Sequence, residues 1–137
     1  MAQTQLTDLG LLPKDDNVFS ENCPSRTLLS HVTNKWGTLI LIALSAGTLR
    51  WSELSRLVGG ISEKMLAQTL RTLEADGLVR RDARPVVPPY VEYSLTDSGV
   101  ELSSHLIPLV KWVAAHAAGD AAKHAAQKSV IPDAQPA

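Results

Sequence analysis

The sequence predicts a mainly α-helical fold with a small β hairpin (α+β), and three observations support this prediction. Apolar residues recur at helical spacing in the segments before residue 77 and after residue 97. Between these segments, Val91, Tyr93 and Leu95 alternate with Glu92 and Ser94, which is the period-two pattern of a strand. Glycines and prolines separate the segments. The 137 residues, 45% of them apolar, suit one compact domain.

The first part of the chain divides into an arm and two helices. Residues 1–21 have no apolar periodicity and contain several acidic residues, so we expect a flexible N-terminal arm. From Pro24 to Val32 the apolar residues fall on one side of a helix. A second helix begins near Trp36, and Gly47 is its expected stop. We expect this second helix to be the most buried in the domain.

The next segment predicts a short strand and a short helix. Residues 49–51 are the expected strand. Ser52 is the expected N-cap of the helix that follows, with Glu53 in its first turn. Leu54 and Leu57 would form the buried side of this helix, and a Gly-Gly pair would end it.

The segment 63–76 predicts an amphipathic helix. Ser62 is its expected N-cap, and Leu66, Leu70 and Leu73 gather on one side. Long polar side chains gather almost opposite: Lys64, Gln68 and Arg71. Met65 lies beside them. Gly77 is expected to end the helix.

Two strands, Leu78–Ala83 and Tyr90–Leu95, are expected to follow, joined by a loop that Pro88 and Pro89 stiffen. The order of short helix, turn, second helix and hairpin is that of a winged helix-turn-helix, in which the second helix enters the major groove of DNA.

The net charge of −1 does not exclude a DNA-binding protein, because phosphate contact needs only a local basic face. Residues 50–84 carry a small excess of basic side chains.

This interpretation assigns two sets of DNA contacts. The expected base-reading residues are Lys64, Met65, Gln68 and Arg71. The expected phosphate contacts, on the helix start and the wing, are Arg50, Ser62, Arg80, Arg81 and Arg84. The alternative for each is an ordinary solvated surface residue, since nearly every surface helix has a polar face.

Thr96 and Asp97 begin a last helix that carries an apolar seam. The seam and the tryptophan beside it are the expected dimer interface: Leu102, Leu106, Leu109, Trp112 and Val113. The alternative is that this helix packs back on its own domain. We expect the globular domain to span 22–117, and the Ala-rich segment 118–137 to be a partly disordered extension whose helix persists to about Gln127.

Several classes of protein are disfavoured. One cysteine excludes an internal disulfide framework and a multi-cysteine metal site, and the four histidines do not lie at metal-ligand spacing with a carboxylate. We therefore expect no metal and no cofactor. No apolar run approaches 18 residues and no secretory signal is present, so we expect a cytoplasmic protein that does not engage a membrane. No catalytic motif indicates an enzyme.

The chain resembles the HxlR-type (DUF24, MarR-related) winged helix-turn-helix regulators of bacteria. The resemblance covers about residues 22–116 and is carried by motifs along this range. They are Cys23-Pro24 with Arg26, Lys35-Trp36, Leu54, Ile61-Ser62-Glu63-Lys64-Met65-Leu66, Leu70-Arg71-Thr72-Leu73-Glu74, Asp76-Gly77-Leu78-Val79, Pro88-Pro89-Tyr90-Val91-Glu92-Tyr93-Ser94-Leu95-Thr96 and Gly99.

This resemblance implies a homodimer, paired through its N- and C-terminal helices, that binds a palindromic site on double-stranded DNA. Many such proteins are repressors that answer oxidants, electrophiles or aromatic compounds. In redox-sensing members the sensor is the cysteine that Cys23 matches. Cys23 directly precedes Pro24, which suits the first turn of a helix, and helix N-termini favour reactive thiolates.

Three alternatives remain open from the sequence. Cys23 could be a small buried hydrophobe at the dimer interface. The regulator could be gated by an aromatic or small apolar effector instead of thiol chemistry, with Trp36, Trp51 and Trp112 lining its pocket. The winged helix could serve as a protein-interaction module.

Overall fold

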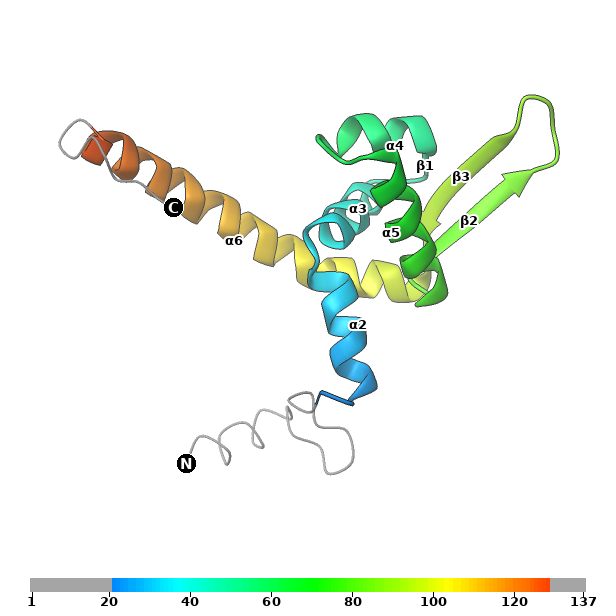
Figure 1. Cartoon of the computed structure of the whole chain (residues 1–137), viewed down its shortest axis with the longest axis horizontal. Coiled ribbons are helices and arrows are strands. Elements are labelled where there is room, and N and C mark those ends of the chain that lie inside the picture. The colour runs from blue at the N-terminus through cyan, green and yellow to red at the C-terminus, as the bar shows by residue number, and fades with distance from the viewer. Residues whose placement is uncertain (1–20, 129–137) are drawn as a thin grey trace.

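The computed structural model describes residues 21–128, except for the side chains of residues 122 and 124–128. Its elements are α2 (Pro24–Thr33), α3 (Lys35–Ser45), β1 (Leu49–Arg50), α4 (Trp51–Leu57), α5 (Glu63–Ala75), β2 (Val79–Arg84), β3 (Tyr90–Leu95) and α6 (Asp97–Lys128). Figure 1 shows α3, α4 and α5 gathered in a body from which the β2–β3 hairpin and the distal half of α6 project. The α+β winged-helix fold is confirmed. The expected arm at 1–20 and the tail after residue 128 lie outside the described residues.

Helix α3 is the centre of the domain, as its sequence predicts. Asn34 caps it by accepting a hydrogen bond from the backbone N–H of Trp36 at 3.0 Å. Ile40, Leu41 and Leu44 are buried, and α3 contacts α2, α4, α5, α6 and β3. The remaining elements are therefore positioned by packing on this helix.

Helix α4 differs from its prediction at both ends. It begins at Trp51 with Arg50, not Ser52, as N-cap, because the Glu53 carboxylate accepts a hydrogen bond from the backbone N–H of Arg50 at 2.9 Å. Leu54 is fully buried, as expected. Leu57 is 63% exposed, so its assignment to the buried side was wrong: the helix ends at Leu57, and Val58 takes the core position.

Helix α5 has the boundaries that its caps predict, to within one residue. At its C-terminus Gly77 adopts φ +76°, and the backbone N–H groups of Gly77 and Leu78 bond to the carbonyls of Glu74 and Leu73, both at 3.0 Å. This is a Schellman motif, which also brings Leu78 into the core next to Leu73. As a result β2 begins at Val79, one residue later than predicted.

The sheet is antiparallel with strand order β1-β3-β2. Val79 pairs with Leu95, and Arg84 pairs with Tyr90 at the end of the ladder nearest the loop. Val79 and Tyr93 are buried in the core. The sheet thus has one face against the helices and one face toward solvent.

Helix α6 has two halves with different surroundings. Before Pro108, Leu106 is only 6% exposed and belongs to the core, and the buried Ser103 hydroxyl donates to the Leu41 carbonyl of α3 at 3.4 Å. Beyond Pro108 the helix leads away from the body (Figure 1). The predicted interface seam is therefore divided. In the single chain Leu106 packs on its own domain, which is the alternative considered for this helix from the sequence.

Three of the remaining seam residues are exposed in the single chain. Leu109, Trp112 and Val113 are exposed on the projecting half of α6, whereas Leu102 is partly buried against the core. The backbone of α6 continues to Lys128, close to the expected end at about residue 127.

The two leucines of α4 give a matched test of this packing. Leu54→Ala should lower the free energy of unfolding by about 2–5 kcal/mol, because it leaves a cavity beneath α4. Leu57→Ala removes the same atoms from an exposed position and should change stability by less than about 1 kcal/mol. Urea unfolding followed by circular dichroism measures both. Equal losses would contradict the placement of α4.

Candidate nucleic-acid interface

Helix α5 presents one polar face because its other face is fully used in packing. Leu66, Leu70 and Leu73 are buried. The side chains on the opposite side of the helix are exposed: Lys64, Gln68 and Arg71. Met65 is half-buried at the edge of this face. We call these four residues the reading face.

The start of α5 is fixed by its cap. The Ser62 hydroxyl oxygen accepts a hydrogen bond from the backbone N–H of Met65 at 3.1 Å, as its position predicts. Ser62 is also exposed, so its hydroxyl lies beside the first turn of the reading face. The turn from α4 enters through Gly60, whose φ of +83° suits glycine.

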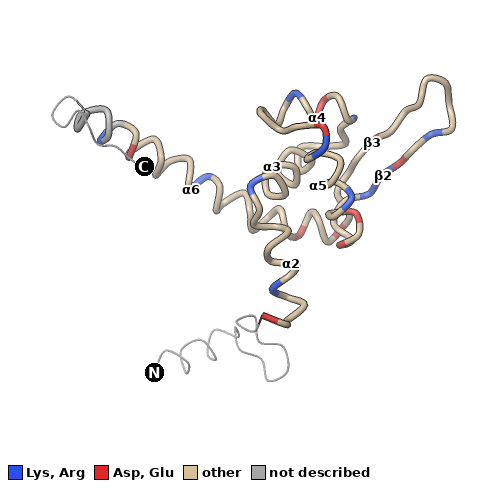
Figure 2. The backbone as a smooth tube through the Cα atoms, viewed as in Figure 1, with Lys and Arg blue, Asp and Glu red and all other residues tan. Residues whose placement is uncertain are grey.

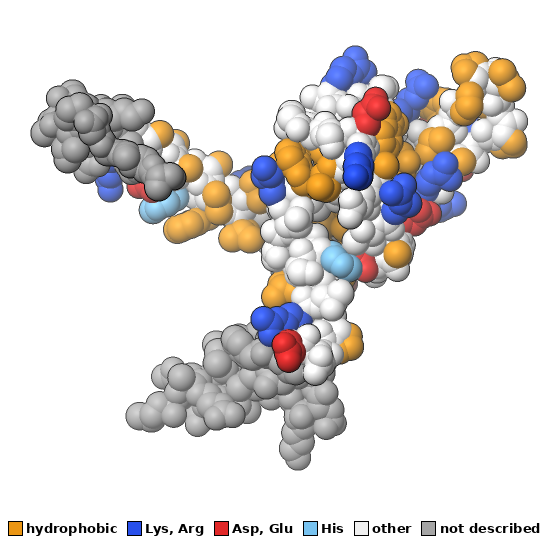
Figure 3. Space-filling model, in the orientation of Figure 1, with side chains coloured by type: hydrophobic (Ala, Val, Ile, Leu, Met, Phe, Trp, Pro, Cys, Tyr) orange, Lys and Arg blue, Asp and Glu red, His pale blue; other side chains and the backbone are white. Residues whose placement is uncertain are grey.

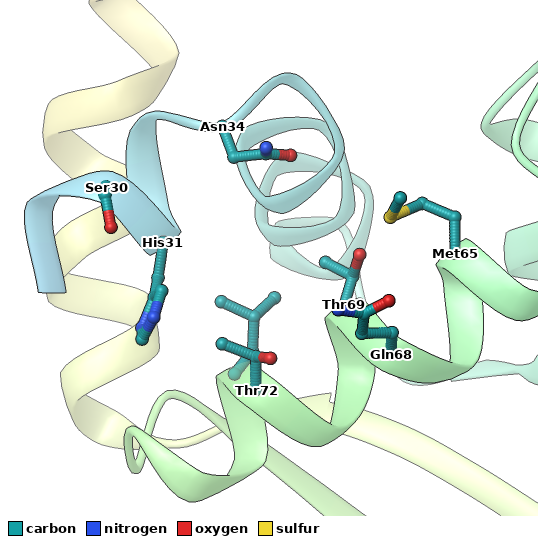
Figure 4. A pocket seen from close by; sticks show the side chains of 8 residues that line it. Ser30, His31, Asn34, Met65, Gln68, Thr69 and Thr72 are labelled. Carbon is teal, nitrogen blue, oxygen red and sulfur yellow. The ribbon is translucent and has the colours of Figure 1, made fainter. Parts of the chain in front are cut away.

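A cavity of about 400 Å³ lies between α2 and α5, along one side of the reading face. It is lined by Ser30, His31, Asn34, Met65, Gln68, Thr69, Thr72 and Leu73. Figure 4 shows that its walls come from the end of α2 and from one side of α5, with the His31 ring beside Thr72. The lining therefore carries hydroxyl, amide and imidazole groups.

A second cavity, of about 370 Å³, lies on the other side of α5, toward the wing. Arg71 of the reading face and Arg81 of β2 both line it, with Trp51, Ala67, Leu70, Glu74 and Tyr93. Arg71 and Arg81 thus open onto a common depression, which joins the reading face to the inner side of the hairpin.

The three arginines assigned to the wing lie on two faces of the sheet. Arg81 pairs with the buried Tyr93, so it belongs to the inner face. Arg80 pairs with Ser94, and Arg84 with Tyr90, which places both on the outer face because side chains alternate along a strand. The sequence-based prediction treated them as one group, whereas the structure brings Arg81 to α5 and Arg84 to Arg50.

Arg50 and Arg84 meet over one aromatic ring on the outer face. The guanidinium carbon of Arg50 lies 4.4 Å from the centre of the Tyr90 ring, and that of Arg84 lies 4.9 Å from it. The Tyr90 hydroxyl donates to Oε1 of Glu92 at 2.6 Å, and Nη2 of Arg84 lies 3.8 Å from the same oxygen. This hydrogen bond to the Glu92 carboxylate raises the pKa of Tyr90 above its ordinary value of 10.0.

Basic side chains surround the reading face. Figure 2 shows Lys and Arg positions on α4, α5 and β2, interspersed with a few acidic ones. In Figure 3 several of these blue side chains stand on the surface around α5 and the base of the hairpin. A surface of this kind suits the phosphate backbone of DNA.

Cys23 lies at the N-cap of α2, with Pro24 in the first turn, and is only 5% exposed. Its expected position at a helix start is therefore correct, and its thiol is buried in this conformation.

Two of the histidines pair with a carboxylate, each with a single aspartate. Nδ1 of His31 lies 2.8 Å from Oδ2 of Asp76, which joins α2 to the end of α5. Nε2 of His116 lies 3.3 Å from Oδ2 of Asp120. The second pair has an i, i+4 spacing that the sequence displays. The first joins residues 45 apart and has no local signal.

The tryptophans do not form the apolar pocket considered from the sequence. Trp51 lines the cavity between α5 and the wing, whereas Trp112 stacks on His116 in α6.

Across residues 21–128, so far as their side chains are described, no group of three or more His, Cys, Asp and Glu residues could hold a metal ion. Within the same range, none of the helices combines the length and apolar character of a membrane span.

Comparison with known proteins identifies the family. A model of the HxlR-like helix-turn-helix matches residues 31–120. The chain belongs to the HxlR family. This family consists of DNA-binding transcriptional regulators, not enzymes, and the chain is a helix-turn-helix transcriptional regulator.

Individual relatives agree with this assignment. The HTH-type transcriptional regulator YtfH of Escherichia coli (strain K12) is 56% identical over 100 residues, which cover 73% of this chain and 79% of YtfH. The solved structure of the putative transcriptional regulator ytfH from Salmonella typhimurium matches with a TM-score of 0.75 and 50% identity, covering 80% of this chain and 98% of that one. The solved structure of the redox regulator HypR in its oxidized form matches with a TM-score of 0.60 and 37% identity. The match covers 66% of this chain and 93% of the HypR chain.

The cap of α5 can be tested by substitutions at one position. Ser62→Ala should lower the free energy of unfolding by about 1 kcal/mol, because the backbone N–H of Met65 loses its acceptor. Ser62→Asp keeps an acceptor at the N-cap and should retain the stability of the unsubstituted protein. Urea unfolding distinguishes the two. A Ser62→Asp protein as unstable as Ser62→Ala would contradict the cap.

Proposed function

We propose that this HxlR-family protein is a homodimeric repressor that binds an inverted-repeat operator with α5 in the major groove. The observation that carries the proposal is the division of α5 into a fully buried leucine side and an exposed polar side within a helix-turn-helix. Lys64, Gln68 and Arg71 are donors of the kinds that read base edges. Such a protein works in the cytoplasm, where bacterial DNA lies.

The homodimer is supported by apolar surface that one chain leaves uncovered. Leu28 and Leu29 of α2 are exposed and line a groove of about 290 Å³ with Ser25, Val32 and Leu102. Leu109, Trp112 and Val113 continue this apolar surface along α6. A contiguous apolar surface on a small protein marks an interaction site, and a two-fold axis through it would present two copies of α5 about 34 Å apart.

The phosphate contacts divide according to the faces of the sheet. Arg81 shares a depression with Arg71, so we assign it to a phosphate next to the bases that α5 reads. Arg50, Arg80 and Arg84 on the outer face would contact the backbone farther along the wing, and Ser62 would contact it at the start of α5.

The reading face is tested by Arg71→Ala and Gln68→Ala. Each should weaken operator binding by about 1–3 kcal/mol and relax the choice of base at one position, because a bidentate base contact is lost. Fluorescence anisotropy on duplexes selected by the protein from random DNA measures both effects. Lys123→Ala, which removes a positive charge from distal α6, is the control and should bind normally. Unchanged affinity in Arg71→Ala would show that α5 is not the reading helix.

We further propose that Cys23 makes the regulator responsive to oxidants or electrophiles. The support is its position at the start of α2, beside the proposed dimer surface, and the similarity to the redox regulator HypR. Because Cys23 is the sole cysteine of the chain, a disulfide switch would join Cys23 to its counterpart in the second copy. Because the thiol is only 5% exposed, it must become accessible before it reacts.

Diamide treatment tests the role of Cys23 directly. We expect diamide to release the unsubstituted protein from its operator in a gel shift and to leave Cys23→Ser bound, since serine does not form a disulfide. Non-reducing electrophoresis should show a covalent dimer only for the unsubstituted protein. Equal release of both proteins would end the sensor hypothesis.

A second candidate is gating by an aromatic or small apolar effector, as considered from the sequence. It is favoured by the cavity between α2 and α5, because Met65 and Gln68 belong to both the cavity and the reading face. Release of the protein from DNA by such an effector should still occur in Cys23→Ser and should be lost in Thr72→Phe, because the phenyl ring fills the cavity.

The protein-interaction module is distinguished by salt. A DNA-binding regulator should lose DNA affinity steeply as salt rises, whereas a protein-interaction module would bind no DNA.

A further inference from the structure

Tyr90 lies on the outer face of the sheet, on the central strand and at the end of the hairpin ladder nearest the loop. It lies on β3, between β1, which supplies Arg50, and β2, which supplies Arg84. Both guanidinium groups lie over its ring, at 4.4 and 4.9 Å from the ring centre to each guanidinium carbon. Because the two strands flank β3 on opposite sides, two positive charges far apart in sequence converge on one aromatic side chain.

The ring restricts two side chains that would otherwise be mobile. An arginine over an aromatic face is attracted by the negative charge density of the ring, and this attraction persists at exposed sites. Each free arginine loses considerable rotamer freedom when it binds a ligand. A guanidinium already held over Tyr90 has lost part of that freedom before a ligand arrives, which lowers the entropic cost of binding.

The Tyr90 hydroxyl acts on the nearest competing anion. It donates to Oε1 of Glu92 at 2.6 Å, whereas Nη2 of Arg84 lies 3.8 Å from the same oxygen. The second distance exceeds the range of about 2.7–3.2 Å for an N–H···O hydrogen bond. The hydroxyl thus competes with Arg84 for the Glu92 carboxylate, whose ion pair with Arg84 is long, and the guanidinium keeps N–H donors for another anion.

We propose that Tyr90 is a positioning residue that holds Arg50 and Arg84 together as one phosphate-binding pair on the wing. This inference deepens the proposed function and rests on it. The anion that fits is a backbone phosphate of DNA, because the two guanidinium groups, 4.4 and 4.9 Å from one ring centre, offer several N–H donors to phosphate oxygens. Tyr90 pairs with Arg84 at the last rung of the hairpin before its loop, where the wing would approach the backbone.

The experiment measures binding to a short duplex of arbitrary sequence over a series of KCl concentrations. Phosphate contacts do not depend on base sequence, and each one contributes about 0.9 to the slope of log affinity against log salt. Tyr90→Leu should weaken binding about tenfold. It should also make the salt dependence shallower by nearly the amount that two phosphate contacts contribute. In an Arg50→Ala/Arg84→Ala background, the same substitution should have no further effect.

Tyr90→Phe separates the ring from the hydroxyl and keeps an aromatic residue in the strand. It should make the salt dependence shallower by about the amount that one phosphate contact contributes, because Glu92 can then form a closer ion pair with Arg84. Adding Glu92→Gln should restore the slope, since the competing carboxylate is then absent. A merely structural role for Tyr90 would change thermal stability without this rescue. Val86→Ala, in the wing loop, is the matched control and should match the unsubstituted protein in affinity and slope.

The outcomes separate the inference from the function on which it rests. If the unsubstituted protein binds no duplex DNA at any salt concentration, the proposed function fails. If it binds, and Tyr90→Leu retains its affinity and slope, the positioning role is wrong. Further weakening by Tyr90→Leu in the double-arginine background would also overturn it, because Tyr90 would then act without these two side chains.

Discussion

Burial of the leucine side of α5 against the rest of the domain is the constraint on which the other features depend. Leu66 and Leu73 are fully buried, and α5 contacts α2, α3 and β2. Rotating α5 by one residue would expose these side chains at a cost of about 2 kcal/mol each. The direction of Lys64, Gln68 and Arg71 is therefore set by the core, and the cap at Ser62 and the Schellman motif at Gly77 set where the face begins and ends.

The same core determines what the chain leaves uncovered. Up to Pro108, α6 is held by Leu106 and by the hydrogen bond from Ser103 to α3. Beyond Pro108 the apolar side chains have no core of their own to cover them. One helix thus completes the domain and also leaves apolar side chains exposed. Helix α2, at the other side of this exposed surface, contacts α5 and is joined to Asp76 by His31.

Local signals predicted the elements well, and contacts distant in sequence were predicted poorly. Ser62, Gly77 and the alternation in Tyr90–Leu95 act within a few residues, so their patterns sufficed. Periodicity showed that α6 has an apolar side but not whether its own core or another chain would cover it. The two faces of β2 follow from strand alternation and could have been predicted. The convergence of Arg50 and Arg84 on Tyr90 depends on strand order, which no local pattern contains.

The central claim is that the exposed side of α5 lies in the major groove, twice per operator. The most direct measurement attaches an iron chelate to Glu63→Cys, at the exposed first position of α5 and outside the reading face, in a Cys23→Ser protein where it is the sole thiol, and maps cleavage of selected operator DNA. We predict two cleavage clusters about one helical turn apart, in adjacent major grooves on one side of the duplex. Absence of cleavage at saturating protein, or a single cluster, would contradict the account.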